Sequence, residues 1–360
     1  MKRNTLAILG TLGFLRAARE LQRGRSVILT YHGVLSGDDD EYNYLNYNFV
    51  AAGTFERQIQ YLLRHYRPIR LADLVRSYRE NTLPPPRSVA LTFDDGFANN
   101  YTVAFPVLQK YGFPFTVFLT TGMLETPGAQ LWSERVKRAV YLCPREAVVL
   151  RILGREIPCP LNSAAAREQS TRRVLQMLKR SPPAERDAAL TVIESTCGRP
   201  EVEARELERY QFLTWTQVRT MASAGVEFGS HTVHHPILST LDDRTLREEL
   251  VESKRRIETE IGQECHALAY PNGQPGDFGV REKRALQAGG YSCGLSLGGT
   301  LNPPRPDPFQ LDRINIGRQF DGPVYQAAVT GILGRLRTMR RALQVRGPSR
   351  GSLDGQVRPC

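Results

Sequence analysis

Residues 88–96 have the sequence Ser-Val-Ala-Leu-Thr-Phe-Asp-Asp-Gly, in which a short apolar run leads directly into two adjacent carboxylates. The run Ser88–Phe93 has the β-branched and aromatic content of a buried strand. The following Asp94-Asp95-Gly96 is ambiguous on its own, because Asp and Gly also favour turns and helix N-termini. It is either an ordinary turn or a pair of catalytic carboxylates, and the rest of the chain must decide between them.

The chain repeats this alternation of strand and helix, which predicts a parallel α/β fold. Strands are expected at Val27–Tyr31, Ser88–Phe93, Phe115–Thr120, Val226–Gly229, Ala267–Tyr270, Tyr291–Leu295 and Leu311–Ile316. Helices are expected at Thr54–Tyr66, Asn99–Tyr111, Thr216–Ala224 and Asp242–Ile261. Seven such units suggest an incomplete barrel. Polar groups at Asp94, His231 and Asn272 follow strand ends, where barrel active sites assemble.

Three of the six histidines lie within His231-Thr232-Val233-His234-His235. A catalytic zinc-like ion takes about three protein ligands and keeps one position open, so one Asp and two His satisfy it. The other Asp of the pair is then free to act as a general base. Residues four apart on a helical turn share a face, so His231 and His235 are expected to converge on one ion. A solvated loop is the alternative, and His234 lies close enough to compete.

These motifs, in this order, resemble the polysaccharide deacetylases, the NodB-homology group of carbohydrate esterase family 4. The resemblance rests on Thr92–Gly96, Ser230–Pro236 and Ala269–Gly273, and it covers the chain from about Val27 to Ile316. It implies a distorted (β/α)7 barrel, and the residues between 121 and 213 add a mainly helical insertion to it. It also implies a metal-dependent hydrolase that removes N-acetyl groups from an N-acetylated sugar.

The resemblance also assigns roles to residues. It makes Asp94 the base, and it makes Asp95, His231 and His235 the ligands of a divalent metal, usually Zn²⁺. His234 is then expected to support a ligand or to face the substrate. In the mechanism we expect, the tetrahedral oxyanion is held by the metal and by a backbone N–H near Asn272.

Two departures from the commoner family pattern leave roles to fill. Ala269 stands where many members carry an Arg that orients the base, and no late Leu-X-His motif follows it. Arg313 is a candidate replacement for the Arg, with a surface salt bridge as the alternative. His32, at the end of the first strand, is a candidate general acid, because a similar Tyr-His occurs in the exopolysaccharide deacetylase branch. A His that merely caps the strand through a backbone hydrogen bond is the alternative.

The predicted domain organisation has four parts. Residues 1–25 form an interfacial N-terminal segment, residues 26–320 the barrel, residues 321–340 a C-terminal helix, and residues 341–360 a disordered basic tail. Between residues 121 and 213 lies an insertion too long for a plain loop. A hairpin of Val148–Leu153 and Glu156–Ile157, joined at Gly154-Arg155, and helices Ala164–Lys179 and Ala184–Ser195 are expected there. The insertion is either a lid or groove wall, or an extension of the core.

Composition fits a soluble globular enzyme, with 41% hydrophobic and 24% charged residues. The net charge of +11 favours anionic headgroups or acidic substrates. The apolar stretch Thr5 to Leu15 is about half the ~20 residues that span a bilayer, and no clear cleavage site follows it. We therefore expect a cytoplasmic enzyme, or one peripheral on the cytoplasmic membrane, with export left open.

The expected partner is an N-acetylated glycan or a lipid-linked sugar, with no nucleic acid, and peripheral membrane contact is left open. A function of a different class remains as the alternative: a catalytically inactive sugar-binding or lipid-binding barrel, suggested by the missing late His.

Overall fold

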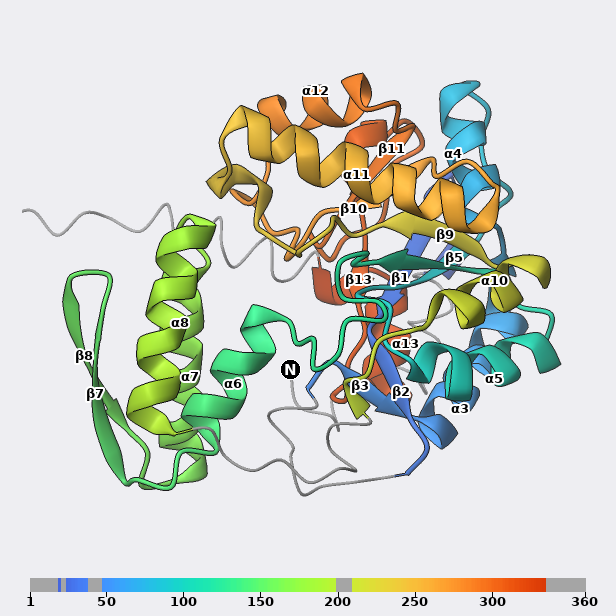
Figure 1. Cartoon of the computed structure of the whole chain (residues 1–360). Coiled ribbons are helices and arrows are strands. Elements are labelled where there is room, and N and C mark those ends of the chain that lie inside the picture. The colour runs from blue at the N-terminus through green and yellow to red at the C-terminus, as the bar shows by residue number, and fades with distance from the viewer. Residues whose placement is uncertain (1–18, 21–23, 38–46, 199–208, 335–360) are drawn as a thin grey trace, which may run out of the picture.

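The structure, a computed structural model, describes residues 19–20, 24–37, 47–198 and 209–334. Figure 1 shows two bodies of secondary structure: a barrel of strands surrounded by helices, and a smaller group of helices with one hairpin at its side. The barrel contains the candidate catalytic residues, and the smaller group is formed by the insertion.

The barrel strands are bonded in the order β12, β11, β10, β9, β6, β5, β1 and β13, and every neighbouring pair is parallel. Their bounds are β1 Val27–Tyr31, β5 Ser88–Phe93, β6 Phe115–Leu119, β9 Glu227–Ser230, β10 Ala267–Ala269, β11 Cys293–Ser296, β12 Leu311–Asp312 and β13 Ile314–Asn315. Because β12 pairs with β11 and β13 pairs with β1, residues 311–315 join the two edges of the sheet. The predicted barrel is confirmed.

Three short strands complete the sheets. Strand β4, Arg67–Pro68, pairs with β5. Strands β2, Gly33–Leu35, and β3, Phe49–Ala51, form a small parallel sheet of their own beyond the end of β1.

Helices cover the outside of the barrel (Figure 1). They are α3 Ala52–His65, α4 Leu71–Arg79, α5 Phe105–Lys110, α10 Trp215–Ser223, α11 Asp243–Ile261, α12 Val280–Ala288 and α13 Gly322–Val329. The central strands β1, β5 and β6 are buried along their whole length. This explains their continuous apolar sequences, because a parallel strand in a barrel is covered on both faces.

The predicted elements are found with small differences at their ends, where assignments normally vary by one or two residues. Two differences are larger. The expected strand Leu311–Ile316 is interrupted at Arg313. The expected helix Asn99–Tyr111 begins as a π-helical turn over Asn100–Ala104 and becomes α-helical only from Phe105.

The insertion folds around a hydrophobic core of its own. It contains helix α6 Trp132–Tyr141, the hairpin of β7 Ala147–Ile152 and β8 Arg155–Pro160, and helices α7 Ala164–Leu178 and α8 Pro183–Cys197. In β7 buried and exposed residues alternate, so the hairpin presents one apolar face to the helices. The core of the insertion includes Trp132, Val136, Val140, Leu150, Ile157, Leu175, Leu190 and Ile193.

The hairpin turn is displaced by one residue from its predicted place. It lies at Leu153 and Gly154, which both have positive φ, 52° and 67°, as a two-residue hairpin turn requires. Strand β8 is also longer than predicted, because its Pro158 and Pro160 lie on an edge strand, where a missing N–H is tolerated. Helix α6 was not predicted from the sequence.

The chain ends contribute less to the described structure. The predicted N-terminal segment, residues 1–25, lies largely outside the described residues, and the predicted tail, residues 341–360, lies entirely outside them. Helix α13 falls within the predicted C-terminal helix 321–340, whose last residues, 335–340, are also outside. Within the described part of the chain, no helix is both long and apolar enough to cross a membrane.

Aromatic packing between α3 and the barrel provides a test of the core. Phe55 is fully buried, and its ring lies 5.2 Å from Tyr31 of β1 and 6.0 Å from Phe93 of β5. We expect Phe55→Ala to lower the free energy of unfolding by about 3–5 kcal/mol, since the removed ring leaves a cavity. Urea denaturation followed by tryptophan fluorescence and circular dichroism measures this. Leu83→Ala is the control, because Leu83 is 66% exposed, and it should change stability by less than about 0.5 kcal/mol.

Candidate active site and metal centre

The candidate catalytic residues meet at one mouth of the barrel, at the C-terminal ends of its strands. Asp94 and Asp95 follow β5, His231 follows β9, and His32 follows β1. They line a cavity of about 400 Å³ together with Asn272, which comes shortly after β10. The parallel arrangement places all these strand ends on one side, which is why residues far apart in the sequence converge.

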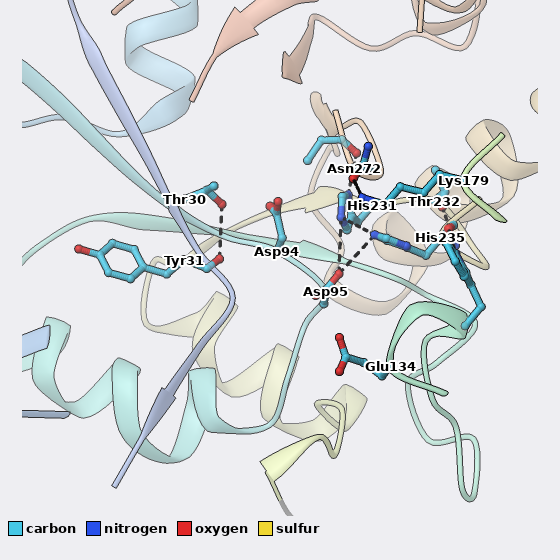
Figure 2. Close-up of polar contacts among 12 residues, drawn as sticks. Thr30, Tyr31, Asp94, Asp95, Glu134, Lys179, His231, Thr232, His235 and Asn272 are labelled. Atoms are coloured by element: carbon cyan, nitrogen blue, oxygen red, sulfur yellow. Dashed lines mark hydrogen bonds and ion pairs between the residues drawn. The ribbon is translucent and has the colours of Figure 1, made fainter. Parts of the chain in front are cut away.

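Asp95, His231 and His235 form the one group of candidate metal ligands found in the described part of the chain (Figure 2). Oδ1 of Asp95 lies 3.6 Å from Nε2 of His231 and 3.5 Å from Nε2 of His235. The two Nε2 atoms are 3.1 Å apart. Ligands about 2.0–2.1 Å from a tetrahedral zinc ion lie roughly 3.3 Å from one another, so the group has suitable dimensions.

The hydrogen bonds around this group orient one imidazole toward the site and leave a carboxylate oxygen without a partner. Nδ1 of His231 lies 2.7 Å from the carbonyl oxygen of Ala269, so Nδ1 carries the proton and Nε2 presents a lone pair to the site. Oδ1 of Asp95 is buried and has no hydrogen-bond partner among the described residues. A buried carboxylate oxygen without a hydrogen-bond partner, beside two imidazole Nε2 atoms, is unfavourable unless a proton or a cation lies between them, and the three atoms together fit a divalent metal.

Burial shapes the charge states of these ligands. Burial, and then the neighbouring His231, lowers the pKa of His235 well below its usual value, and burial also lowers the pKa of His231. Burial, with the charges of Asp94 and Glu134, raises the pKa of Asp95 well above its usual value. Both imidazoles are therefore neutral at pH 7, as metal ligands must be.

The two candidate ligand histidines lie on a loop, so the predicted helical turn is wrong. Thr232 and His235 both have positive φ, 69° and 57°. The loop is fixed by side chains: the Thr232 N–H donates to Oγ of Ser230, and the His235 N–H donates to Oγ1 of Thr232, both at 3.0 Å. His234 is turned outward and binds Glu249 through Nδ1 at 2.7 Å, so it lies outside the ligand group.

Backbone strain is concentrated at this site. Asp95, Thr232, His235 and Asn272 are four of the eight non-glycine residues with positive φ in the described part of the chain. Such conformations cost of order 1–3 kcal/mol each and persist where the surrounding structure imposes them. Gly96 also has positive φ, and a Cβ there would lie 2.9 Å from the Leu119 side chain. The Asp-Asp-Gly sequence therefore fits a strained turn that aims both carboxylates into the mouth.

Asp94 is held by a fully buried arginine. Nη1 and Nη2 of Arg313 donate to the two oxygens of Asp94 at 2.6 and 2.8 Å. Although burial alone would raise the pKa of Asp94, the Arg313 guanidinium, with further contributions from His231 and His32, holds that pKa well below its usual range. The alternative of a surface salt bridge is wrong, because the Arg313 side chain is 0% exposed.

His32 and Asn272 both line the cavity. Nδ1 of His32 is buried and has no hydrogen-bond partner within the described ranges. Burial lowers the pKa of His32 to about 4, and the Asp94 charge opposes this shift. The Asn272 side chain is fixed in place, since its Oδ1 accepts from Lys179 and its Nδ2 donates to Asp277.

Sequence reasoning did not identify the residues that the insertion contributes to the cavity. Trp132, Glu134 and Lys137 of α6, and Lys179 at the end of α7, all line it. Figure 2 shows the Glu134 carboxylate on the side of the site where Asp95 lies. The spacing of Glu134 and Lys137 by three residues is a signal of a helical ion pair. Nothing in the sequence indicates that this helix turns toward the barrel mouth.

Fold and site together define a class of protein: a hydrolase built on a parallel barrel, with paired carboxylates and imidazoles at its C-terminal mouth. The family profile described as polysaccharide deacetylase matches residues 82–142 and 163–291, more than half of the chain. The chain therefore belongs to the polysaccharide deacetylase family, whose members hydrolyse the amide bonds of N-acetylated sugars.

Similar proteins carry related names. A Bacillus subtilis protein named as a polysaccharide deacetylase, YxkH, is 20% identical over 303 residues, which make up 84% of this chain and 75% of that protein. The poly-beta-1,6-N-acetyl-D-glucosamine N-deacetylases of Escherichia coli K12 and Staphylococcus epidermidis are 28% and 34% identical. Those two matches cover 33% and 28% of this chain, and only 17% and 37% of the relatives.

Solved structures show the same fold. The Streptococcus pyogenes deacetylase PplD, in complex with acetate, superposes with a TM-score of 0.57 at 20% identity, over 85% of this chain and 98% of that one. IcaB from Ammonifex degensii superposes with a TM-score of 0.52 at 18% identity, over 85% of this chain and 97% of that one.

The division of roles between the two aspartates is testable by metal analysis. We expect Asp95→Ala or His231→Ala to remove the metal, because each deletes a ligand atom of the three-residue group. Asp94→Asn should retain it, since Asp94 binds Arg313 instead. Plasma emission spectroscopy of the purified, zinc-loaded variants measures the ion per chain. Loss of the ion from Asp94→Asn, with retention in Asp95→Ala, would reverse the assigned roles.

Proposed function

We propose that this chain is a zinc-dependent N-deacetylase that releases acetate from an N-acetylated sugar in a polysaccharide or glycan precursor. One observation carries the proposal: the Arg313-bound carboxylate of Asp94 lies beside a largely buried group of Asp95, His231 and His235 whose dimensions suit a metal. Family membership supplies the reaction class, and the donor set of one carboxylate and two imidazoles favours zinc.

Asp95, His231 and His235 would hold the ion. When bound, it supplies Lewis acidity that activates water and polarises the acetamide carbonyl. The three protein ligands leave a coordination position open for this chemistry, as in other catalytic zinc sites.

Asp94 is the proposed base that takes a proton from the attacking water. Both of its oxygens are held by Arg313, which also donates to the hydroxyl oxygens of Thr30 and Thr92 at 3.2 and 3.3 Å. These contacts fix the direction in which the carboxylate faces. Arg313 thus acts as a positioning residue, in the role left open by Ala269.

His32 is the proposed acid that protonates the leaving amine as the C–N bond breaks. Burial lowers the pKa of His32 to about 4, so His32 is neutral near pH 7 and must receive a proton during the reaction before it can donate one; the Asp94 charge is the neighbouring group that favours this protonated form. A backbone N–H near Asn272 is proposed to stabilise the oxyanion. Water and the acetamide are consumed, and acetate and a free amine are produced.

The names of related deacetylases point to a class of substrate, which we propose for this chain. Two of them are named for poly-β-1,6-N-acetylglucosamine, so a polymer or oligomer of N-acetylated hexosamine is the first candidate. A lipid-linked sugar, cytoplasmic location and peripheral membrane contact through the N-terminal segment remain further predictions. The alternative of an inactive binding barrel predicts binding without acetate release.

Acetate release tests the proposed function directly. The zinc-loaded full chain is incubated with β-1,6-linked and β-1,4-linked N-acetylglucosamine oligomers and with a lipid-linked N-acetylated sugar, and acetate is measured enzymatically. We expect release from at least one of these substrates, and its abolition in Asp94→Asn. Binding of the sugars without release by the wild-type chain would support the inactive barrel instead.

The acid role of His32 predicts an effect that depends on the leaving group. His32→Ala should lose about 10²–10⁴ in kcat on an acetamide, the usual contribution of a general acid. It should lose much less on an aryl acetate, whose leaving group needs no proton, and its zinc content should not change. Parallel kinetics on the two substrates measure this. Equal losses on both would make His32 a structural residue.

The Arg313 contact predicts a shift in the pH profile. Without the guanidinium, burial would raise the pKa of Asp94, and the base would be protonated over a wider acidic range. The acidic limb of kcat/KM should therefore move to higher pH in Arg313→Gln. Arg313→Lys, which keeps a positive charge, should shift less, although one ammonium cannot hold both oxygens. An unshifted limb in Arg313→Gln would contradict the assignment of Asp94 as the titrating base.

A further inference from the structure

Glu134 is a buried carboxylate that the mechanism above does not use. It lies in the first turn of α6, and its residue is 9% exposed. Its Oε1 accepts a hydrogen bond from Lys137 at 2.6 Å. Its Oε2 is buried and has no hydrogen-bond partner in the part of the chain that the structure describes. An unsatisfied buried carboxylate oxygen is unfavourable, so its retention calls for a partner from outside the chain.

The position of Glu134 is fixed relative to the metal site. The neighbouring Trp132 donates from its indole N–H to the carbonyl oxygen of the ligand His235, at 3.4 Å. The Arg186 guanidinium of α8 lies 5.1 Å from the Trp132 ring and packs on it from the insertion side. Helix α6 is thereby anchored to the loop that carries His231 and His235, and Glu134 faces the cavity from this anchor.

Glu134 does not belong to the ligand group itself. Among the described residues, only Asp95, His231 and His235 have metal-binding atoms that all lie within 4.8 Å of one another. Glu134 also differs from Asp95 in its ion pair, because it binds Lys137. Asp95 has only histidines as ion-pair partners within the described residues. Glu134 is thus placed to accept a hydrogen bond from a ligand that is already held at the metal.

We propose that Oε2 of Glu134 accepts a hydrogen bond from the ring hydroxyl next to the acetamido carbon of the substrate. This inference rests on the proposed function and deepens it. When the acetamide carbonyl lies at the metal site, the adjacent ring carbons lie within a few ångströms. One of them forms the glycosidic bond, and the other, C3, carries a hydroxyl that can donate. The insertion therefore selects N-acetylhexosamines whose C3 hydroxyl is free.

The charge of Glu134 adds a second level of selection. A C3 substituent removes the donor and occupies the space beside the carboxylate, and an acidic substituent is also repelled by it. N-acetylhexosamines that carry a 3-O-linked sugar, ether or carboxylate are therefore poor substrates. Lys137 holds the carboxylate in the accepting orientation and is a positioning residue for it.

Two probes that differ in one hydroxyl test the contact: the methyl glycoside of N-acetylglucosamine and its 3-deoxy analogue. Acetate release is measured for the zinc-loaded wild type, Glu134→Gln and Glu134→Ala. In the wild type, kcat/KM for the parent should exceed that for the 3-deoxy probe by about 10–100-fold, the range of a hydrogen bond to a charged group. Glu134→Ala should lose this preference, because the substitution lowers kcat/KM only for the parent glycoside. The near-isosteric Glu134→Gln should reduce the preference.

Two controls distinguish a hydrogen bond to the sugar from loss of the metal and from a general effect of charge. The zinc content of both Glu134 variants should equal that of the wild type, because Glu134 is not a ligand. Glu146→Gln is the matched control: it removes the same charge from an exposed position of the same insertion, and it should leave both kinetic values unchanged. Loss of zinc from Glu134→Gln, or a Glu134→Ala variant that keeps the wild-type preference for the parent, would overturn the proposal.

Binding separates this inference from the proposed function. The dissociation constants of both probes are also measured by NMR titration for Asp94→Asn and for Asp94→Asn combined with Glu134→Ala. If the wild type releases no acetate from either probe, the proposed deacetylation of such sugars fails. The inference then stands if Asp94→Asn binds the parent glycoside about 10-fold more tightly than the 3-deoxy probe. The added Glu134→Ala substitution should abolish this difference in affinity. It falls if the two probes bind equally or if neither binds.

Discussion

The buried ion pair between Asp94 and Arg313 is the contact on which both the barrel and the site depend. Arg313 is the residue between β12 and β13, so it sits where the sheet edges are joined. Its guanidinium reaches the end of β5, while its Nε donates to the Ser296 carbonyl oxygen of β11 at 3.3 Å. Isolated in the barrel interior, either charge would be strongly unfavourable, and removal of one partner from such a pair typically costs about 3–5 kcal/mol. The nearly closed arrangement of the strands is therefore also the arrangement that places Asp94, the proposed base.

The sequence contained enough information for the barrel and for the residues at its mouth, because both depend on local patterns. Buried parallel strands such as Ser88–Phe93 are continuous apolar runs, and polar residues that directly follow them must lie at the strand ends. The conformation of the His231–His235 loop could not be obtained in this way. A spacing of four residues fits a helix, but two residues with positive φ and hydrogen bonds from side chains make the same convergence possible in a loop. Likewise, only the closed sheet shows that Arg313 is buried and not on the surface.

The insertion shows a different limit of sequence reasoning. Its hairpin and two of its helices were predictable, because each is bounded by Gly or Pro and has a clear period. How it contacts the barrel depends on long-range contacts, such as the Trp132 hydrogen bond to His235 and the Lys179 contact with Asn272. These contacts bring α6 and the end of α7 to the cavity. The barrel supplies the groups that do chemistry, and the insertion, with a core of its own, supplies side chains that can vary with the substrate without disturbing the barrel.

Charge balance in the cavity explains why this combination calls for a cation. Three carboxylates line it, and two of them have their own positive partners: Asp94 has Arg313 and Glu134 has Lys137. Asp95 faces two histidines whose pKa values are lowered by burial, so neither imidazole offers a positive charge near neutral pH. An ionised Asp95 is thus the one carboxylate of the three left without compensation. A divalent ion at the meeting point of its Oδ1 and the two Nε2 atoms would balance that charge and satisfy all three donor atoms at once. The remaining positive charge would then favour the oxyanion that forms when the acetamide is attacked.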